Sequence, residues 1–266
     1  IAFYTGEAPP RLVALDPATG KETVVGEMPV DTLYTSLSPD SRWVAFSASD
    51  DMSAYNMKNH RVYLRAVDAR GGDWRKLGAD LDGDVSVGWW SPDGRTIYFN
   101  EGVKATNQLF ALDVASGKVR QLTHWEAAAS VTQDEDTKRL LVNWVDPTTP
   151  PQLYTVASLD RLGDRARWTL LADPNAWMRS QLALGEEQEI SWRSKDGKIV
   201  GGVLVKPVGW QPGKKYPLLV AIHGGPAAAD LLTFNGGYGA QVYAGQGWVI
   251  LRPNYRGSTN YGEAHK

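Results

Sequence analysis

Short segments of alternating apolar and polar residues fill the first two thirds of the chain and predict β-strands. Residues 37–46 are a polar Ser-Pro-Asp turn followed by the run Trp-Val-Ala-Phe, and residues 90–99 repeat this arrangement 53 positions later. Proline sets φ for such a turn, and Asp or Gly completes it. Residues 133–142 are interpreted as a third, weaker copy. Each copy therefore predicts a turn that leads into a strand.

A second pattern, two short apolar runs joined by a polar turn, accompanies the first and is typical of a β-hairpin. The paired runs are 11–16 with 22–25, 60–64 with 74–77, 108–113 with 116–122, and 152–156 with 168–171. Each unit then holds about four strands in ~40–50 residues, the period of propeller blades. Residues 1–172 are predicted to form a partial all-β propeller of about four blades. A β-sandwich of hairpins is the alternative, and the recurring Ser-Pro-Asp turn argues against it.

The pattern of apolar and polar residues changes after residue 172. Residues 173–190 are predicted to be a linker, with a short helix over 176–184 and an acidic run, 186–189, that we interpret as solvated. From 191 onward, Asp196-Gly197 between two alternating runs predicts a hairpin. Strands are expected at 218–222 and 248–251, with a short helix over 236–246. Residues 191–266 are thus predicted to be the N-terminal part of an α/β-hydrolase domain, whose sheet begins with an antiparallel edge.

Composition narrows the function classes. A formal charge of −2 and the absence of long apolar runs give no reason to expect a nucleic-acid or membrane partner. With no cysteine, the chain has no disulfide, thiolate metal site or cysteine nucleophile. The compartment stays open, with the cytoplasm slightly favoured. Both ends of the chain are interpreted as cuts through a larger protein.

Metal sites are not predicted, and no cofactor is expected. Residues 80–84 resemble a calcium loop only faintly, since the glycine at the sixth position and the glutamate at the twelfth are missing. This segment is interpreted as a turn. His60 and His124 stand alone in the sequence, so each is interpreted as a packing or surface histidine.

The candidate catalytic segment directly follows the apolar run Tyr216–Ala221. It reads Ile222-His223-Gly224-Gly225-Pro226. Glycine has no Cβ, so a reacting carbonyl oxygen can approach its backbone closely. In α/β-hydrolases a loop of this kind supplies one N–H group of the oxyanion hole. A simple Gly-Gly-Pro turn after a strand is the alternative interpretation.

Residues 222–226, followed by Asn-Tyr-Arg-Gly-Ser-Thr-Asn-Tyr-Gly at 254–262, resemble the prolyl oligopeptidase family of serine peptidases. The acylaminoacyl-peptidase and dipeptidyl-aminopeptidase-like branch is the most similar part of the family. That family joins a β-propeller to a C-terminal α/β-hydrolase domain, and the resemblance covers essentially the whole chain. Asn260 stands where glycine is expected, and asparagine is the next best residue for a left-handed turn.

The resemblance implies roles for individual residues. Gly224 and Gly225 would offer the oxyanion-hole N–H, with Gly225 the preferred donor, and His223 would fix the loop rather than act as the base. Arg256 would pair with a carboxylate, with an exposed loop cation as the alternative. The rim of the active site would be formed by His223, Pro226, Asn254, Tyr255, Arg256 and Gly257.

The chain departs from the family at the nucleophile, because no serine has glycine at both −2 and +2. The order in α/β-hydrolases is Ser, then Asp or Glu, then His, so all three are expected beyond Lys266. The resemblance implies a segment of a propeller-gated serine peptidase that cleaves peptide or acyl-aminoacyl bonds of short peptides. This segment alone is predicted to be inactive and to need the remainder of the same protein or a complementary chain. An esterase on the same scaffold and a non-catalytic propeller binding module are the alternatives.

Overall fold

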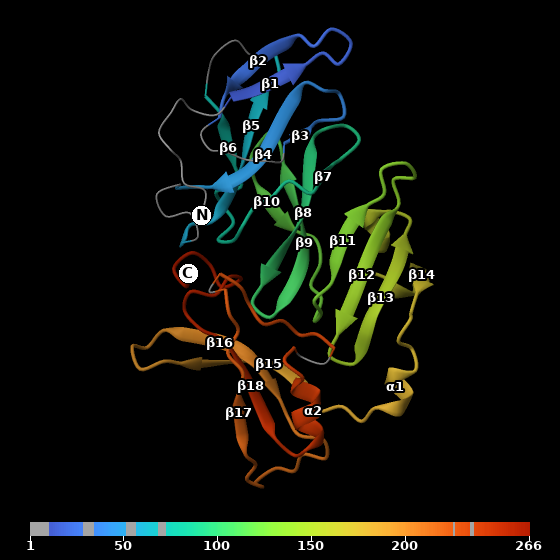
Figure 1. The fold of residues 1–266 in the computed structure, drawn as a ribbon, viewed down its shortest axis with the longest axis vertical. Helices are drawn as coiled ribbons and strands as arrows, with labels where there is room; N and C mark the ends of the chain where they lie inside the picture. Colours follow the sequence, from blue (N-terminus) through green and yellow to red (C-terminus); the bar gives the residue numbers. More distant parts are fainter. Residues whose placement is uncertain (1–10, 29–34, 52–56, 69–72, 226, 235–236) are drawn as a thin grey trace. The chain divides into compact units, whose positions relative to one another are not determined.

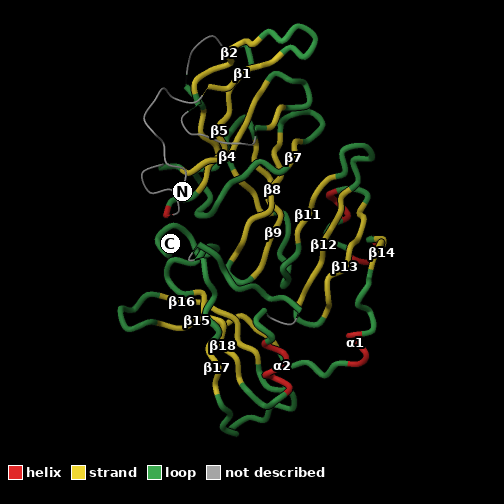
Figure 2. The backbone as a smooth tube through the Cα atoms, viewed as in Figure 1, coloured by secondary structure: helices red, strands yellow, loops and turns green. Residues whose placement is uncertain are grey.

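The computed structural model describes residues 11–28, 35–51, 57–68, 73–225, 227–234 and 237–266. Strands and loops make up most of this part of the chain (Figures 1 and 2). Two compact units can be separated, residues 1–98 with 111–119, and residues 99–110 with 120–266. None of the described helices has the length and apolar character needed to cross a membrane.

The first unit contains a two-stranded and a four-stranded sheet of antiparallel neighbours (Figure 1). The strands are β1 (Arg11–Leu15), β2 (Glu22–Glu27), β3 (Ser36–Leu37), β4 (Trp43–Ser49), β5 (His60–Ala66) and β6 (Arg75–Leu77). Phe46 on β4 stacks on Tyr63 of β5 with ring centroids 5.1 Å apart, and Trp74 meets Phe46 edge-on at 4.8 Å. These rings form the centre of the apolar cluster that holds the sheet together.

Two further four-stranded sheets follow, with strand orders β10-β9-β8-β7 and β11-β12-β13-β14. Their strands are β7 (Trp89–Trp90), β8 (Thr96–Val103), β9 (Thr106–Asp113), β10 (Val119–Gln121), β11 (Ser130–Gln133), β12 (Leu140–Asp146), β13 (Thr149–Val156) and β14 (Thr169–Ala172). In the three four-stranded sheets built from β3 to β14, strands that follow one another in the sequence are neighbours. Small sheets of this kind are compatible with a propeller-like domain, as the repeat predicted.

The first two Ser-Pro-Asp turns share one hydrogen-bond pattern. The Ser38 hydroxyl donates to Asp40 at 2.6 Å and accepts from the Trp43 N–H at 3.0 Å, and Ser91 bonds in the same way to Asp93 and to Thr96. In both turns the residue after the aspartate, Ser41 or Gly94, has positive φ.

The third, weaker copy is also a turn that leads into a strand, β12, but its side chains form different hydrogen bonds from those of the first two. Asp134 accepts from both the N–H and the hydroxyl of Thr137, at 2.7 and 2.6 Å, and the positive φ falls on Lys138. This is the pattern of the β9–β10 turn, where Asp113 accepts from Ser116 at 2.7 and 2.6 Å. The turn still joins the first two strands of its sheet, where the repeat placed it.

The second unit ends in a mixed sheet of order β15-β16-β18-β17, in which only the β17–β18 pair is parallel. The strands are β15 (Glu187–Arg193), β16 (Ile199–Val205), β17 (Leu218–Val220) and β18 (Val249–Asn254), and the helices of this unit are η2 (Leu159–Arg161), η3 (Arg165–Arg167), α1 (Met178–Gln181) and α2 (Ala240–Gly245). Val205 and Ile250 pack against Ala240 and Ala244 of α2, which covers one face of the sheet.

The expected hairpin at Asp196-Gly197 is present, with Gly197 at φ +79° in its turn. The predicted strand at 218–222 is shorter, since β17 ends at Val220, and both predicted helices span fewer residues than expected. The interpretation of 186–189 as a solvated run is wrong for Glu187, which lies buried at the start of β15. A charge there must find a partner inside the protein, because burial without one is costly.

Candidate active-site loop

The segment after β17, residues 223–225 and 227–230, is called the glycine loop here. Gly225 has φ +99°, in the region that side chains disfavour, and a Cβ on Gly224 would meet no atom within 4 Å. Both glycines are exposed, and among the described residues their N–H groups have no hydrogen-bond acceptor. The loop therefore leaves two backbone donors open to a ligand oxygen. Pro226 lies outside the described residues.

His223 is held from several directions at the start of the glycine loop. Its Nε2 lies 3.0 Å from the Ser258 hydroxyl, and its Nδ1 lies 3.2 Å from the Gly224 carbonyl oxygen. The Tyr255 ring stacks on the imidazole at a centroid distance of 4.6 Å, and its hydroxyl donates to the His223 carbonyl at 2.7 Å. His223 as a whole residue is only 6% exposed. This arrangement suits a side chain that fixes the loop.

The far end of the glycine loop is tied to the end of β18 by Asn254. The Asn254 Oδ1 accepts from the Asp230 N–H at 2.6 Å, and its Nδ2 donates to the Asp230 carbonyl at 3.0 Å. One side chain thus satisfies both backbone groups of Asp230, as a neighbouring strand would. The Thr259 N–H also donates to the Ala228 carbonyl at 3.0 Å.

A buried ion-pair network lies beneath the same segment. The Arg252 guanidinium is 3.3 Å from Asp230 and 2.6 Å from Glu187. It also donates to the Leu231 carbonyl at 3.1 Å, while Glu187 accepts from the Thr233 N–H at 3.1 Å. Burial raises the pKa of Glu187 to about 7, because the loss of hydration outweighs the attraction to Arg252.

Arg256 lies on the exposed side of the loop that follows β18. It forms an ion pair with Asp196 in the β15–β16 turn. The Ser194 hydroxyl, and after it Arg256, hold the pKa of Asp196 at about 2. Gly257, at φ +101°, donates its N–H to the His265 carbonyl at 2.8 Å. The rim residues 254–257 are therefore fixed by their neighbours in the same unit.

Sequence reasoning missed several residues that hold this site. His265 is buried, and its Nε2 lies 3.0 Å from the Tyr255 carbonyl and 3.2 Å from that of Asn254. Glu187, Asp230, Arg252 and Ser258 were also not predicted. Their partners lie between 22 and 65 positions away along the chain. The one available signal is Arg252, a charge that directly follows the apolar run 248–251.

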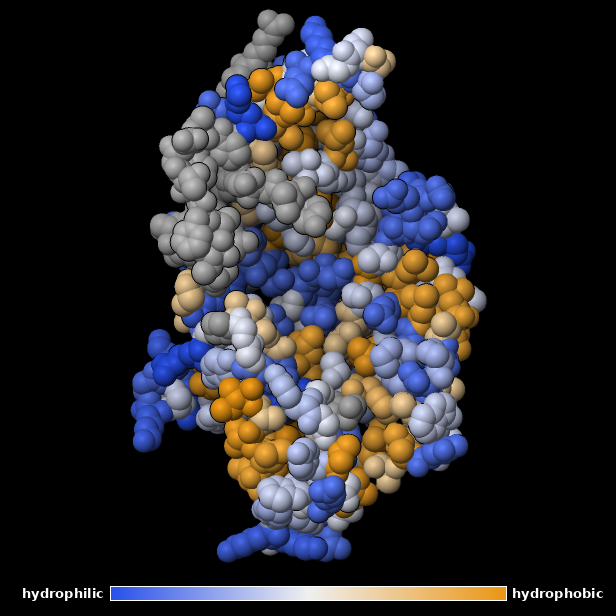
Figure 3. Space-filling model, viewed as in Figure 1, coloured by the Kyte–Doolittle hydropathy of each residue, from blue (hydrophilic) through white to orange (hydrophobic). Residues whose placement is uncertain are grey.

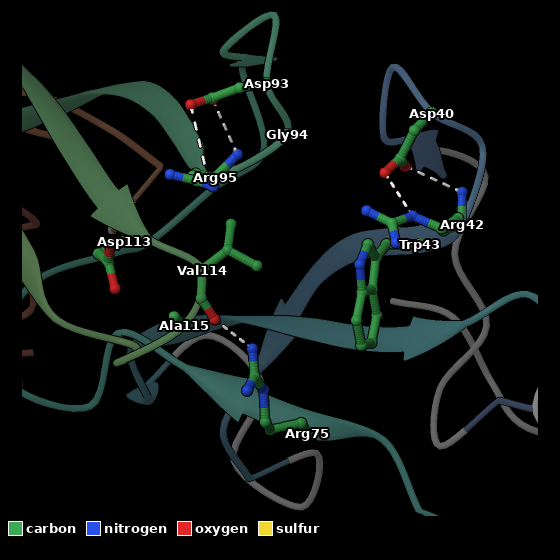
Figure 4. A pocket seen from close by; sticks show the side chains of 10 residues that line it. All are labelled: Asp40, Arg42, Trp43, Arg75, Asp93, Gly94, Arg95, Asp113, Val114 and Ala115. Atoms are coloured by element: carbon green, nitrogen blue, oxygen red, sulfur yellow. Dashed lines mark hydrogen bonds and ion pairs between the residues drawn. The ribbon is translucent and has the colours of Figure 1, made fainter.

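A separate hollow of about 760 Å³ lies within the first unit (Figure 4). It is lined by Asp40, Arg42, Trp43, Arg75, Asp93, Gly94, Arg95, Asp113, Val114 and Ala115. The Arg42 and Arg95 guanidinium groups lie against the aspartates of their own turns, and Arg75 donates to the Val114 carbonyl. The lining contains three arginines and three aspartates, so its formal net charge is zero. Among the described residues no group of three or more His, Asp or Glu is placed to hold a metal.

The chain is similar to known peptidases. It is 26% identical over 235 residues to dipeptidyl-peptidase 5 of Trichophyton equinum, covering 85% of this chain and 31% of that protein. The fold resembles acylaminoacyl peptidase of Pyrococcus horikoshii, with a TM-score of 0.68 at 23% identity over 93% of this chain and 36% of that one. It also resembles dipeptidyl peptidase 4 of Porphyromonas gingivalis, with a TM-score of 0.69 at 15% identity over 96% of this chain and 36% of that one. No protein-family model matches the chain.

The relatives that the chain matches are peptidases, which are hydrolases. The resemblance to the prolyl oligopeptidase family, stated from the two motifs, is confirmed by these homologues. The chain spans about 31% of the length of the curated relatives it matches, consistent with an internal segment of such a protein.

Proposed function

We propose that this chain is the part of a propeller-gated serine peptidase that supplies one side of the oxyanion hole. The observation that carries the proposal is the glycine loop, where the Gly224 and Gly225 N–H groups are exposed and lack an acceptor among the described residues. A backbone donor fixed in advance stabilises the charge that develops on a carbonyl oxygen during attack by a nucleophile. Gly225 is the preferred donor, since its backbone conformation is one that glycine adopts without strain.

The reaction proposed is hydrolysis of a peptide or acyl-aminoacyl bond in a short peptide. A serine activated by a histidine and an acid, all beyond Lys266, would attack the carbonyl carbon. The oxyanion would accept from the Gly225 N–H and from the N–H after that serine. The relatives' names, dipeptidyl-peptidase and acylaminoacyl peptidase, support this substrate class.

The domain assignment remains part of the proposal. We assign residues 1–172 to a partial propeller, 173–190 to a linker, and 191–266 to the first strands of an α/β-hydrolase domain. The pairing of an antiparallel β15–β16 hairpin with a parallel β17–β18 pair supports the last assignment. The propeller would restrict access to the active site, and the remainder of the protein would complete that site.

The test is treatment of the full-length protein with a fluorophosphonate, followed by intact-mass measurement. We expect one phosphonate adduct, located by peptide mapping on a serine downstream of Lys266. Turnover of an aminoacyl-anilide above that of a matched p-nitrophenyl ester is expected for a peptidase, and the reverse order would make the protein an esterase. An unlabelled protein that hydrolyses neither substrate would contradict the proposal.

A further inference from the structure

The turn between β8 and β9, residues 103–106, connects two segments that hold the glycine loop. On one side, the Lys104 N–H donates to the Asn260 carbonyl at 2.8 Å, and the Asn260 Nδ2 donates back to the Lys104 carbonyl at 3.1 Å. On the other side, the Leu232 N–H donates to the Ala105 carbonyl at 2.8 Å. Two adjacent residues of the turn, Lys104 and Ala105, therefore bind two segments of the chain. Lys104 binds the segment after β18 at Asn260, and Ala105 binds the segment after the glycine loop at Leu232.

Buried contacts anchor the same turn to the mixed sheet. Ala105 is fully buried and packs against Val203 of β16 and against Leu232. The Ala105 N–H lies 3.3 Å from one carboxylate oxygen of Glu189, and the Lys104 ammonium lies 3.3 Å from the other. The turn therefore has a defined position relative to β15 and β16, because it is fixed by packing as well as by hydrogen bonds.

Gly102 and Asn260 fit one another. The amide group of Asn260 occupies the space that a Cβ on Gly102 would fill. Asn260 has φ +73°, a conformation that glycine also adopts, but a glycine there would lack the side-chain bond to Lys104. The departure from the family motif at position 260 therefore supplies a second hydrogen bond to the turn.

The contacts lead from this pair to the glycine loop in one step. Thr259, next to Asn260, donates its N–H to the Ala228 carbonyl at 3.0 Å. Ser258 meets the His223 imidazole at 3.0 Å. Leu232, which donates to Ala105 of the turn, directly follows Leu231 in the sequence. The Leu231 carbonyl accepts a hydrogen bond from Arg252 at 3.1 Å. A shift of the turn 103–106 would therefore move both segments that hold the glycine loop, residues 258–260 and residues 231–232.

We propose that Gly102 and Asn260 are positioning residues that set the direction of the Gly225 N–H through the turn 103–106. This inference rests on the proposed peptidase function. A small misplacement of a catalytic group lowers the reaction rate strongly, because the N–H donor must meet the carbonyl oxygen at the position where its negative charge develops. We expect Asn260→Gly and Gly102→Ala each to lower kcat roughly tenfold, with KM changed less than about twofold.

The experiment uses the full-length protein with an aminoacyl-anilide as substrate and a peptide aldehyde as inhibitor. The serine adds to the aldehyde and places an oxygen in the oxyanion hole, so the Ki reports the donors directly. Lys138→Gly is the control for Asn260→Gly, since Lys138 also has a positive φ, +58° against +73° for Asn260, in the exposed β11–β12 turn. Gly163→Ala is the control for Gly102→Ala, because a Cβ at Gly163 meets no atom within 4 Å.

A tenfold fall in kcat, matched by a rise in the aldehyde Ki and by unchanged KM and unfolding midpoint, would support the inference. Wild-type kcat and Ki in both variants, while the wild-type protein is active, would overturn it and leave the proposed function standing. A fall in kcat that parallels a loss of folded protein, with the Ki of the folded fraction unchanged, would also overturn it. If the wild-type protein neither hydrolyses the anilide nor reacts with fluorophosphonate, the proposed function itself fails.

Discussion

Arg252 and Glu187 form an ion pair at 2.6 Å in which the side chains are 1% and 0% exposed. Glu187 lies at the start of β15 and Arg252 near the end of β18, and Asp230 of the glycine loop completes the network. One cation thus faces two carboxylates in a region with little water. This relationship gives the first two predictions.

Replacing Arg252 by methionine is expected to destabilise the protein strongly, by about 3–5 kcal/mol. Above pH 7, where most of Glu187 is ionised, the substitution leaves two carboxylates, with side chains 0% and 11% exposed, without their cation, which costs more than the loss of the pair itself. The measurement is the free energy of unfolding in urea. Arg256→Met is the matched control, because the Arg256–Asp196 pair is exposed and its loss is expected to shift the midpoint little. Equal effects of the two substitutions would contradict the prediction.

The stability of the protein is expected to fall as the pH rises from about 4.5 to about 7. The pKa of Glu187 is raised from 4.5 to about 7 in the folded protein, so the folded state keeps a proton that the unfolded state has lost. This stabilisation is complete below the lower value and is lost as the pH passes the upper one. Urea midpoints for the wild type and for Glu187→Gln, measured across this range, test it. The difference between the two proteins should change with pH, and a constant difference would exclude Glu187 as the source.

Gly225→Ala in the full-length protein is expected to lower kcat by about 10²-fold. A methyl group at φ +99° strains the backbone and turns the N–H away from its direction. The prediction is checked by steady-state kinetics with an aminoacyl-anilide. Gly209→Ala, another exposed positive-φ glycine whose Cβ would meet no atom, controls for backbone strain alone. The two variants are expected to lose similar stability, while only Gly225→Ala loses activity.

Arg165→Ala is expected to destabilise the sheet β11–β14 by about 0.5–1 kcal/mol. The Arg165 guanidinium lies 4.1 Å from the ring centroid of Trp144, which contacts Trp168 edge-on at 5.6 Å. Near-ultraviolet circular dichroism should show the looser packing of the tryptophans. Arg165→Lys should lose part of the stabilisation that Arg165 provides, because an ammonium does not stack on a ring as a guanidinium does. Arg167→Ala, which removes an exposed pair with Asp164 at 3.0 Å, is the control.

Local patterns in the sequence predicted the strands and hairpins well. The runs after Ser38 and Ser91 form β4 and β8, and Asp196-Gly197 forms a hairpin turn. These features depend on alternation and on turn residues that are close together in the chain. The copy at 133–142 also forms a turn before a strand, but the sequence did not predict that its Asp134 and Thr137 side chains would bond differently from those of the first two copies.

The candidate site was predicted only where its residues form a contiguous motif. The two motifs named His223 to Gly225 and Asn254 to Gly257, whose roles stay a prediction, and Pro226 lies outside the described residues. Glu187 was misread because a run of three glutamates resembles a solvated segment, whereas its burial depends on Arg252, 65 positions away. Contacts between residues so far apart in the sequence depend on the fold, and no local pattern in the sequence predicts them.

The exposed apolar side chains near β17 have a practical consequence. Among the described residues β17 has a neighbouring strand on one side only, and Leu218, Val220 and Ile222 are 56%, 46% and 65% exposed. Figure 3 shows hydrophobic residues at the surface in the region where Figure 1 draws the mixed sheet. An open strand edge beside such side chains is a template for self-association. A preparation of this segment alone would therefore report on aggregation kinetics, and catalytic measurements belong with the intact gene product.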